Sequence, residues 1–115
     1  MPIQYADRAK DPGETLIYSM TFTPGRAIAT GDTLEGTPSV TVTRLSDGHD
    51  VTSDDLGHVP PIVGMLDEKT LSVNTIFATI SGGADGESYK ITFTCDTTNG
   101  EVAVEEDLVI EVKEL

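Results

Sequence analysis

Metal-binding and acid–base side chains gather at one place in the chain, the aspartate-rich segment 46–55. It contains His49, and the only other histidine, His58, follows shortly after it. Neither histidine has a partner at a spacing that would fix a metal ion or activate a nucleophile. Carboxylate oxygens suit hard cations such as calcium, and the aspartates that could supply them are Asp47, Asp50, Asp54 and Asp55. Because the segment lacks the ligand order and final glutamate of an EF-hand, we interpret it as a solvated loop, with calcium binding as the weaker alternative.

A glycine-rich segment and a single cysteine are the other features that could carry chemistry. Gly82, Gly83 and Gly86 suggest a phosphate cradle, but no lysine and no helical pattern follow them, so we predict a corner between β-strands. Cys95 is the only cysteine, which excludes an intramolecular disulfide and is typical of a protein made in a reducing cytosol. It shares an apolar row with its neighbours, which favours a packed thiol. We therefore predict no catalytic residue, no cofactor and no enzymatic activity.

The strand after the glycine corner is the clearest structural signal. Its apolar residues alternate with lysine and threonine, as expected when one face meets a core; they are Tyr89, Ile91, Phe93 and Cys95. A tyrosine at this place is typical of the tyrosine corner of immunoglobulin-like (Ig-like) sandwiches, in which the hydroxyl bonds to the preceding loop. Antibody domains carry a cysteine two residues later. This chain has Ile91 there, so we expect packing alone to hold the core.

A final hairpin is predicted at Asn99-Gly100, because these residues accept the backbone angles of tight turns. The apolar residues that follow share one parity, and Glu106 falls on the same parity; the apolar set is Val102, Val104, Leu108, Ile110 and Val112. We expect either a bulge near Glu106 or a strand that leaves the core there.

The remaining segments favour short strands separated by turns. Residues 16–22 and 39–43 alternate in polarity, and a parity change between Leu71 and Ile76 predicts a bulge or break near Asn74. The whole pattern predicts an all-β fold, an Ig-like β-sandwich of about seven antiparallel strands without a disulfide. We expect an N-terminal arm over residues 1–10, either mobile or lying on a neighbouring subunit, and a single domain over residues 11–115.

Composition restricts the partners. Seven basic and 20 acidic residues give a formal charge of −13, and a surface without a basic patch disfavours nucleic-acid binding. No apolar run approaches the length of a membrane span, and the N-terminus lacks the pattern of a signal peptide. We therefore expect neither a nucleic-acid nor a membrane partner.

Four short motifs occur in order along the chain. They are Lys10-Asp11-Pro12 at the first turn, Gly31-Asp32-Thr33, the corner from Ser81-Gly82-Gly83 to Tyr89, and Thr97-Thr98-Asn99-Gly100. As a set they resemble a family of small tailed-bacteriophage proteins, described as fibre–tail adaptors or similar virion components with an Ig-like sandwich. The resemblance covers about residues 10 to 112. The chain departs from that family in having no tryptophan in its first strand and in having glutamates in the last hairpin, where relatives often have arginine. The docking surface therefore does not carry over.

The resemblance implies a non-enzymatic structural component of a phage particle, an adaptor or head-decoration module that is made in the host cytoplasm and resides in the virion. Its partners would be capsid, neck, tail or fibre proteins, or further copies of itself in a homo-oligomer. Two alternatives stay open. One is a bacterial Ig-like surface adhesion or carbohydrate-binding module, and the other is a small carbohydrate-active or metal-dependent enzyme.

Overall fold

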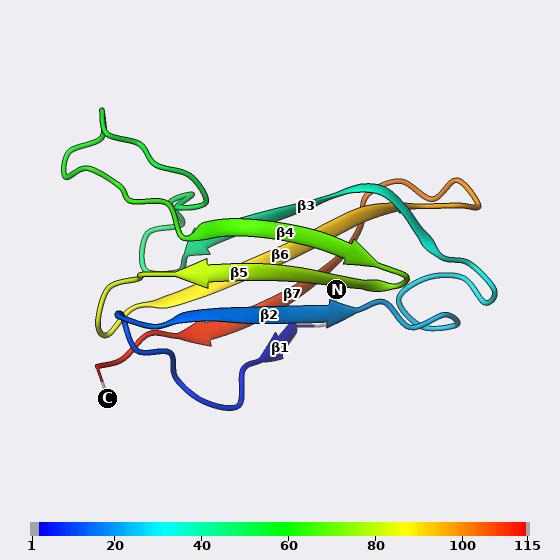
Figure 1. Ribbon diagram of the computed structural model, residues 1–115, viewed down its shortest axis with the longest axis horizontal. Coiled ribbons are helices and arrows are strands. Elements are labelled where there is room, and N and C mark those ends of the chain that lie inside the picture. Colours follow the sequence, from blue (N-terminus) through cyan, green and yellow to red (C-terminus); the bar gives the residue numbers. More distant parts are fainter. Residues whose placement is uncertain (1–2, 115) are drawn as a thin grey trace.

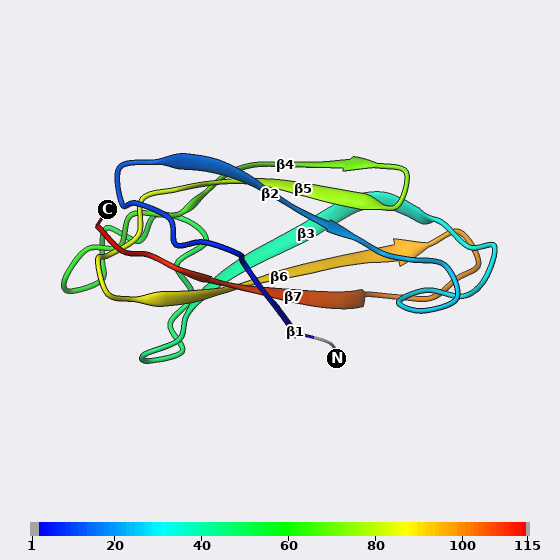
Figure 2. The same ribbon diagram turned by 90° about the horizontal axis from the view of Figure 1, so that it is seen from below.

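Two β-sheets face each other in the computed structural model, which describes residues 3–114. The three-stranded sheet has the order β2 (Thr15–Thr21), β5 (Thr75–Ser81), β4 (Leu66–Ser72) and is antiparallel throughout. The four-stranded sheet has the order β1 (Ile3–Tyr5), β7 (Val104–Glu111), β6 (Ser88–Thr97), β3 (Leu34–Arg44). Within the described residues there is no helix and no disulfide. Figures 1 and 2 show the two layers from perpendicular directions.

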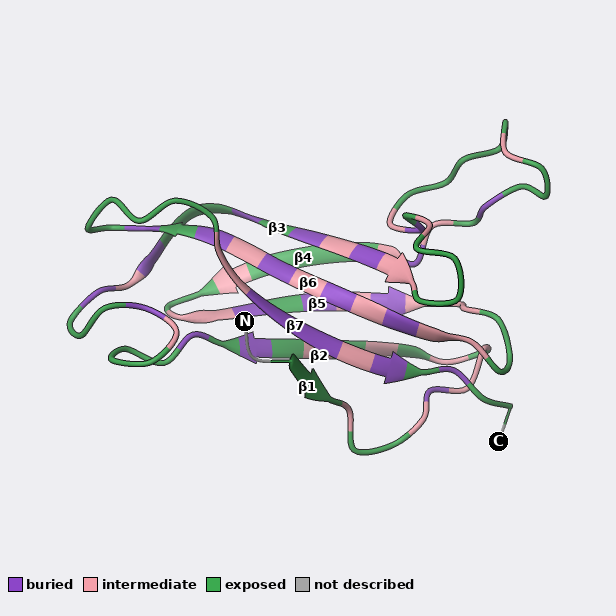
Figure 3. Ribbon diagram, turned by 180° about the vertical axis from the view of Figure 1, so that it is seen from behind, coloured by how far each residue is buried: buried purple, intermediate pink, exposed green. Residues whose placement is uncertain are grey.

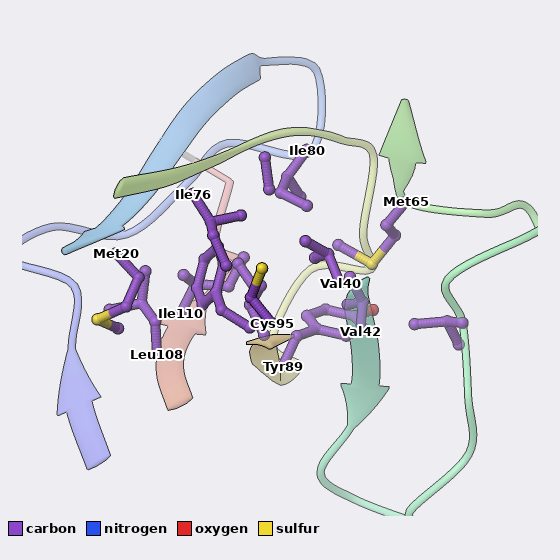
Figure 4. Close-up of a cluster of buried hydrophobic side chains, with 14 of the residues drawn as sticks. Met20, Val40, Val42, Met65, Ile76, Ile80, Tyr89, Cys95, Leu108 and Ile110 are labelled. Atoms are coloured by element: carbon purple, nitrogen blue, oxygen red, sulfur yellow. The ribbon is translucent and has the colours of Figure 1, made fainter. Parts of the chain in front are cut away.

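The core lies between the layers and follows the alternation of the strands. In β6, odd-numbered residues from Tyr89 to Cys95 are buried, while those between them are partly exposed (Figure 3). Ile76, Ala78 and Ile80 of β5 meet this row from the opposite sheet. Figure 4 shows side chains from both sheets converging on the same volume, which includes the Tyr89 ring. Removing such side chains from water is the main force that holds two sheets together.

The last hairpin is longer than the predicted Asn99-Gly100 turn. β6 ends at Thr97 and β7 begins at Val104, so residues 98–103 connect the two strands, and Gly100 has φ +95° whereas Asn99 has no positive φ. Val102 precedes the strand and is exposed, so its predicted place in the core is wrong. Glu106 lies in unbroken register opposite Phe93 and is buried, so neither the predicted bulge nor the predicted departure from the core occurs.

Of the bulge or break expected near Asn74, the break is confirmed, because β4 ends at Ser72 and β5 begins at Thr75. Val73 and Asn74 form a two-residue turn that joins β4 directly to β5. Such a turn reverses the chain and changes the parity of the inward row, which explains the shift between Leu71 and Ile76.

The N-terminal segment pairs with the four-stranded sheet. Ile3, Gln4 and Tyr5 align with Asp107, Leu108 and Val109 in parallel, which differs from the purely antiparallel arrangement expected. Lys10 is fully buried, and its ammonium donates hydrogen bonds to the carbonyl oxygens of Asp11 (3.0 Å) and Gly82 (2.7 Å). Residues 1 and 2 of the predicted arm, and residue 115 of the predicted domain, lie outside the described residues.

Candidate docking surfaces

The glycine corner is held together by its own contacts. Gly82, Gly83 and Gly86 all have positive φ angles, which L-residues adopt at a cost. The hydroxyl of Tyr89 accepts a hydrogen bond from the Ala84 backbone N–H at 2.9 Å. A Cβ atom on Gly83 would come within 2.8 Å of the Val112 side chain, so the corner sits close against the end of the chain. These contacts hold the corner in place and give it a structural role.

The core residues of β6 are equally structural. Ile91 and Phe93 are completely buried between the sheets. Cys95 is buried as well, and its thiol donates to the Glu35 carbonyl oxygen at 3.1 Å. Burial raises the pKa of the Cys95 thiol, which keeps it protonated and unreactive. This strand therefore supplies packing and carries no nucleophile.

The candidate calcium ligands are engaged with their own loop. Asp47 accepts two hydrogen bonds from the Arg44 guanidinium, at 3.0 and 2.7 Å, and these bonds together with one from the His49 N–H lower the pKa of Asp47. Asp50 accepts the Thr52 N–H at 2.9 Å, and Asp54 accepts the Gly64 N–H at 2.6 Å.

These carboxylates do not converge on a common point. Asp55 pairs through its backbone with Ile62. Among residues 3–114, no group of three or more histidine, cysteine, aspartate or glutamate side chains could hold a metal ion. The rings of His49 and His58 lie 4.5 Å apart, and His58 Nδ1 donates to the Pro60 carbonyl oxygen at 2.8 Å.

Asp32 organises the end of the molecule that contains Asn99 and Gly100. Its side chain is 1% exposed, and Oδ1 accepts hydrogen bonds from the Thr98 hydroxyl at 2.7 Å, the Thr33 N–H at 2.9 Å and the Asn99 N–H at 3.1 Å. Burial pushes the pKa of Asp32 upward, but these bonds outweigh it and the pKa is lowered. Sequence reasoning identified Asp32 only as a turn residue, because its partners lie more than 60 positions away.

Exposed apolar side chains gather on the connection between β3 and β4. We name residues 53–64 the projection, which Figure 1 shows extending from one end of the sandwich. Leu56, Val59 and Val63 are 74%, 91% and 75% exposed. The projection is ordered at its base, because Asp55 and Ile62 exchange two backbone hydrogen bonds at 2.9 and 3.0 Å. Sequence patterning missed it, since its residues show no periodicity.

The sheet edges differ in how well they are protected. β4 carries Asp67, Glu68 and Lys69, and β3 contains Pro38 and a register shift between Glu35 and Ser39. Charges, prolines and irregular register discourage another strand from pairing. β2, the remaining edge of the three-stranded sheet, has the sequence TLIYSMT with none of these features.

In the part of the chain that the structure describes, no helix is long and apolar enough to cross a membrane.

Comparison with known proteins gives one match. No curated protein and no solved structure shows significant similarity to this chain. A family model does match, over residues 10–111, and its description is Podophage GP4 fiber-tail adaptor protein gp77. That match runs from the buried Lys10 through the glycine corner to the end of β7, almost the whole sandwich, and on this ground the chain belongs to the gp77 family of podophage fibre–tail adaptor proteins.

Proposed function

We propose that this protein is a non-enzymatic structural component of a tailed-phage particle, an adaptor that joins the tail to a fibre through protein–protein contacts. The observation that carries the proposal is the family match over residues 10–111. Its partners are then other virion proteins, and its location is the assembled particle, after synthesis in the host cytoplasm.

The described side chains support a structural role. The side chains of five chemically capable residues bond to their own loops or to the backbone nearby: Asp47, Asp50, Asp54, His58 and Cys95. The most exposed of the large apolar side chains, Val59, instead lies on the projection with Leu56 and Val63, at one end of a molecule that measures 44 × 31 × 22 Å. An ordered segment that presents apolar side chains to water is suited to insertion into a partner. With a formal charge of −13, the partner surface is expected to be protein and not nucleic acid.

We also propose that the sandwich is Ig-like, with the N-terminal ten residues as an arm on a single domain over residues 11–115. Immunoglobulin constant domains place strands B, E and D side by side in one sheet, and C, F and G in the other. The orders β2–β5–β4 and β3–β6–β7 match this arrangement when β2 is taken as strand B. The hydrogen bond from Ala84 to the Tyr89 hydroxyl, at the start of the strand that corresponds to F, supports the same assignment.

The proposal can be tested on purified particles. Quantitative mass spectrometry of virions should find this chain at a fixed ratio to the tail protein, and particles from a phage that lacks its gene should carry tails without fibres. Absence of the chain from purified virions, or normal fibre attachment without it, would refute the adaptor assignment.

A further inference from the structure

One side of the sandwich is hollowed between the two sheets, and one contact crosses it: Gln4 Nε2 of β1 donates to Met20 Sδ of β2 at 3.5 Å. We name this side the seam; β2 borders it on one side, and β1, β7 and the chain between β1 and β2 border it on the other. Figure 2 shows that connecting chain passing from the four-stranded sheet to the start of β2 across this side. The seam contains two hollows. Leu16, Tyr18 and Leu108 line the first, and Gln4, Thr21 and Glu106 line the second.

The edge of β2 that borders the seam has no partner strand. β5 pairs with β2 along its whole length, from Thr15 to Thr21, and no other described strand pairs with it. An unpaired edge presents a row of backbone N–H and C=O groups to which an extended segment can add as a new strand. Ile17, which is 68% exposed, offers apolar contact at the same place.

Two polar atoms in the seam are buried without a partner. The Tyr18 hydroxyl, from the first hollow, and Glu106 Oε2, from the second, have no hydrogen bond among the described residues, although both atoms are shielded from solvent. Glu106 as a whole is only 5% exposed. Arg26 lines the same hollow but forms no ion pair with Glu106. Since buried polar groups in folded proteins are nearly always bonded, these two atoms lack the partners expected for them among residues 3–114.

The group that ionised Glu106 lacks among residues 3–114 would be a donor, and best a cation. Burial, followed by the nearby charge of Asp107, raises the pKa of Glu106. A lysine or arginine side chain would compensate the buried carboxylate and donate the absent hydrogen bond. A second copy of this chain would bring another strongly acidic surface to the seam, whereas a basic segment of a different protein is electrostatically matched.

We propose that the seam is a docking site for an extended, basic segment of another virion protein, which adds to the free edge of β2 as a strand and places a lysine or arginine against Glu106. This inference rests on the proposed adaptor function and deepens it by specifying the surface and the chemistry of the partner. The projection and the seam then form two separate contacts, as an adaptor between two bodies requires.

Site-specific photocrosslinking in assembled particles tests the location. A benzophenone amino acid at the exposed position Ser19, which borders the seam, should crosslink to a lysine- or arginine-containing segment of another virion protein. The matched control is Thr70, exposed on β4 at the protected edge. A crosslink from Ser19 only to a second copy of the chain, no crosslink from Ser19, or the same crosslink from both positions would overturn the proposal. Absence of the chain from the particles would instead refute the adaptor function itself.

A double-mutant cycle tests the ion pair. The probe is a synthetic peptide with the sequence of the crosslinked segment, used with and without replacement of its basic residue by glutamine. Glu106→Gln should weaken binding of the basic peptide by about tenfold or more and should not weaken binding of the neutral peptide further. Glu111→Gln, at an exposed position of the same strand, is the control. Equal losses with both peptides would overturn the role of Glu106, and a urea titration of each variant verifies that it is folded.

Discussion

Tyr18 and Tyr89 form a natural pair for measuring what a buried hydroxyl contributes. The Tyr89 hydroxyl accepts a hydrogen bond from Ala84, whereas the Tyr18 hydroxyl is buried without a partner among residues 3–114. We expect Tyr89→Phe to lower the free energy of unfolding by about 1 kcal/mol, the net value of one hydrogen bond. Tyr18→Phe should leave stability unchanged or raise it. Urea titrations monitored by circular dichroism would give both midpoints, and equal losses from the two substitutions would contradict the structure.

Glu106 should make the stability of the isolated protein depend on pH. Its pKa is raised in the folded state, mainly by burial, so ionisation at neutral pH favours the unfolded chain. Glu106→Gln removes that penalty and should be more stable than the wild type above the folded pKa. The advantage should shrink as the pH falls and disappear below about 4.3, the usual pKa of an unfolded glutamate.

Urea midpoints between pH 4 and 8 would measure this difference. Glu111→Gln is again the control, because its side chain is exposed and should change the midpoint little at any pH. A Glu106→Gln variant that is less stable than the wild type at neutral pH would show that a group in the isolated chain already compensates the carboxylate. A stabilised protein that binds its partner less well is the combination expected of a residue kept for docking.

At the scale of elements, alanine substitutions in the glycine corner separate two costs of adding a side chain: strain in the left-handed backbone and steric overlap with neighbouring atoms. Gly83 and Gly86 both have positive φ, but only at Gly83 would an added Cβ meet other atoms, at 2.8 Å from Val112 and 3.1 Å from Met65. Gly86→Ala should cost about 1 kcal/mol for the left-handed backbone alone. Gly83→Ala should cost more, because the side chain of Val112, the residue after β7, must also move. Thermal or urea unfolding of the two variants would rank them, and the reverse order would contradict the close packing of the corner against Val112.

The elements that could be predicted from sequence are those whose pattern is local. The alternation from Tyr89 to Cys95 predicts one buried row of side chains, whichever strands lie beside this one. The burial of that row is confirmed. At Val73-Asn74 the sequence could not decide between a bulge and a break, because a bulge and a two-residue turn both change the parity of an apolar row. Val102 shares the parity of the core but precedes the first paired residue, Val104, and parity alone does not show where pairing begins.

Pairings between distant segments leave no local signal. β1 is a three-residue strand whose partner, β7, lies about 100 positions away, and the two run parallel without a turn to join them. Whether β2 has a free edge depends on which strands lie beside it. The absence of charged residues in β2 therefore indicates an unprotected edge only once the sheet order is known. The seam, the part of the candidate site that such pairings create, was therefore not predictable from composition or periodicity.

At the scale of the whole molecule, the candidate contacts are distributed over an elongated body. Figure 1 shows the projection at one end, with the β4–β5 turn and the β6–β7 connection at the other. The seam runs along the side between the two sheets, beside β2. A body with separate contact surfaces can hold two partners without bringing them into contact, and several modest contacts together give a firm attachment when copies are repeated in a particle.

The projection offers the clearest test of this arrangement, because its base closes independently of its tip. Asp55 and Ile62 already face each other as an antiparallel pair, so residues 56–61 can be replaced by the two-residue turn Asn-Gly. Ile62 is buried and stays in place, and we therefore expect the shortened protein to fold with an unfolding midpoint close to that of the wild type. Its incorporation into particles should fall strongly, because the deletion removes Leu56 and Val59, the apolar side chains that a partner would bury. Complementation of a phage lacking the gene, read by quantitative mass spectrometry of purified particles, measures this; a folded variant that is incorporated at the wild-type ratio would exclude the projection as a contact.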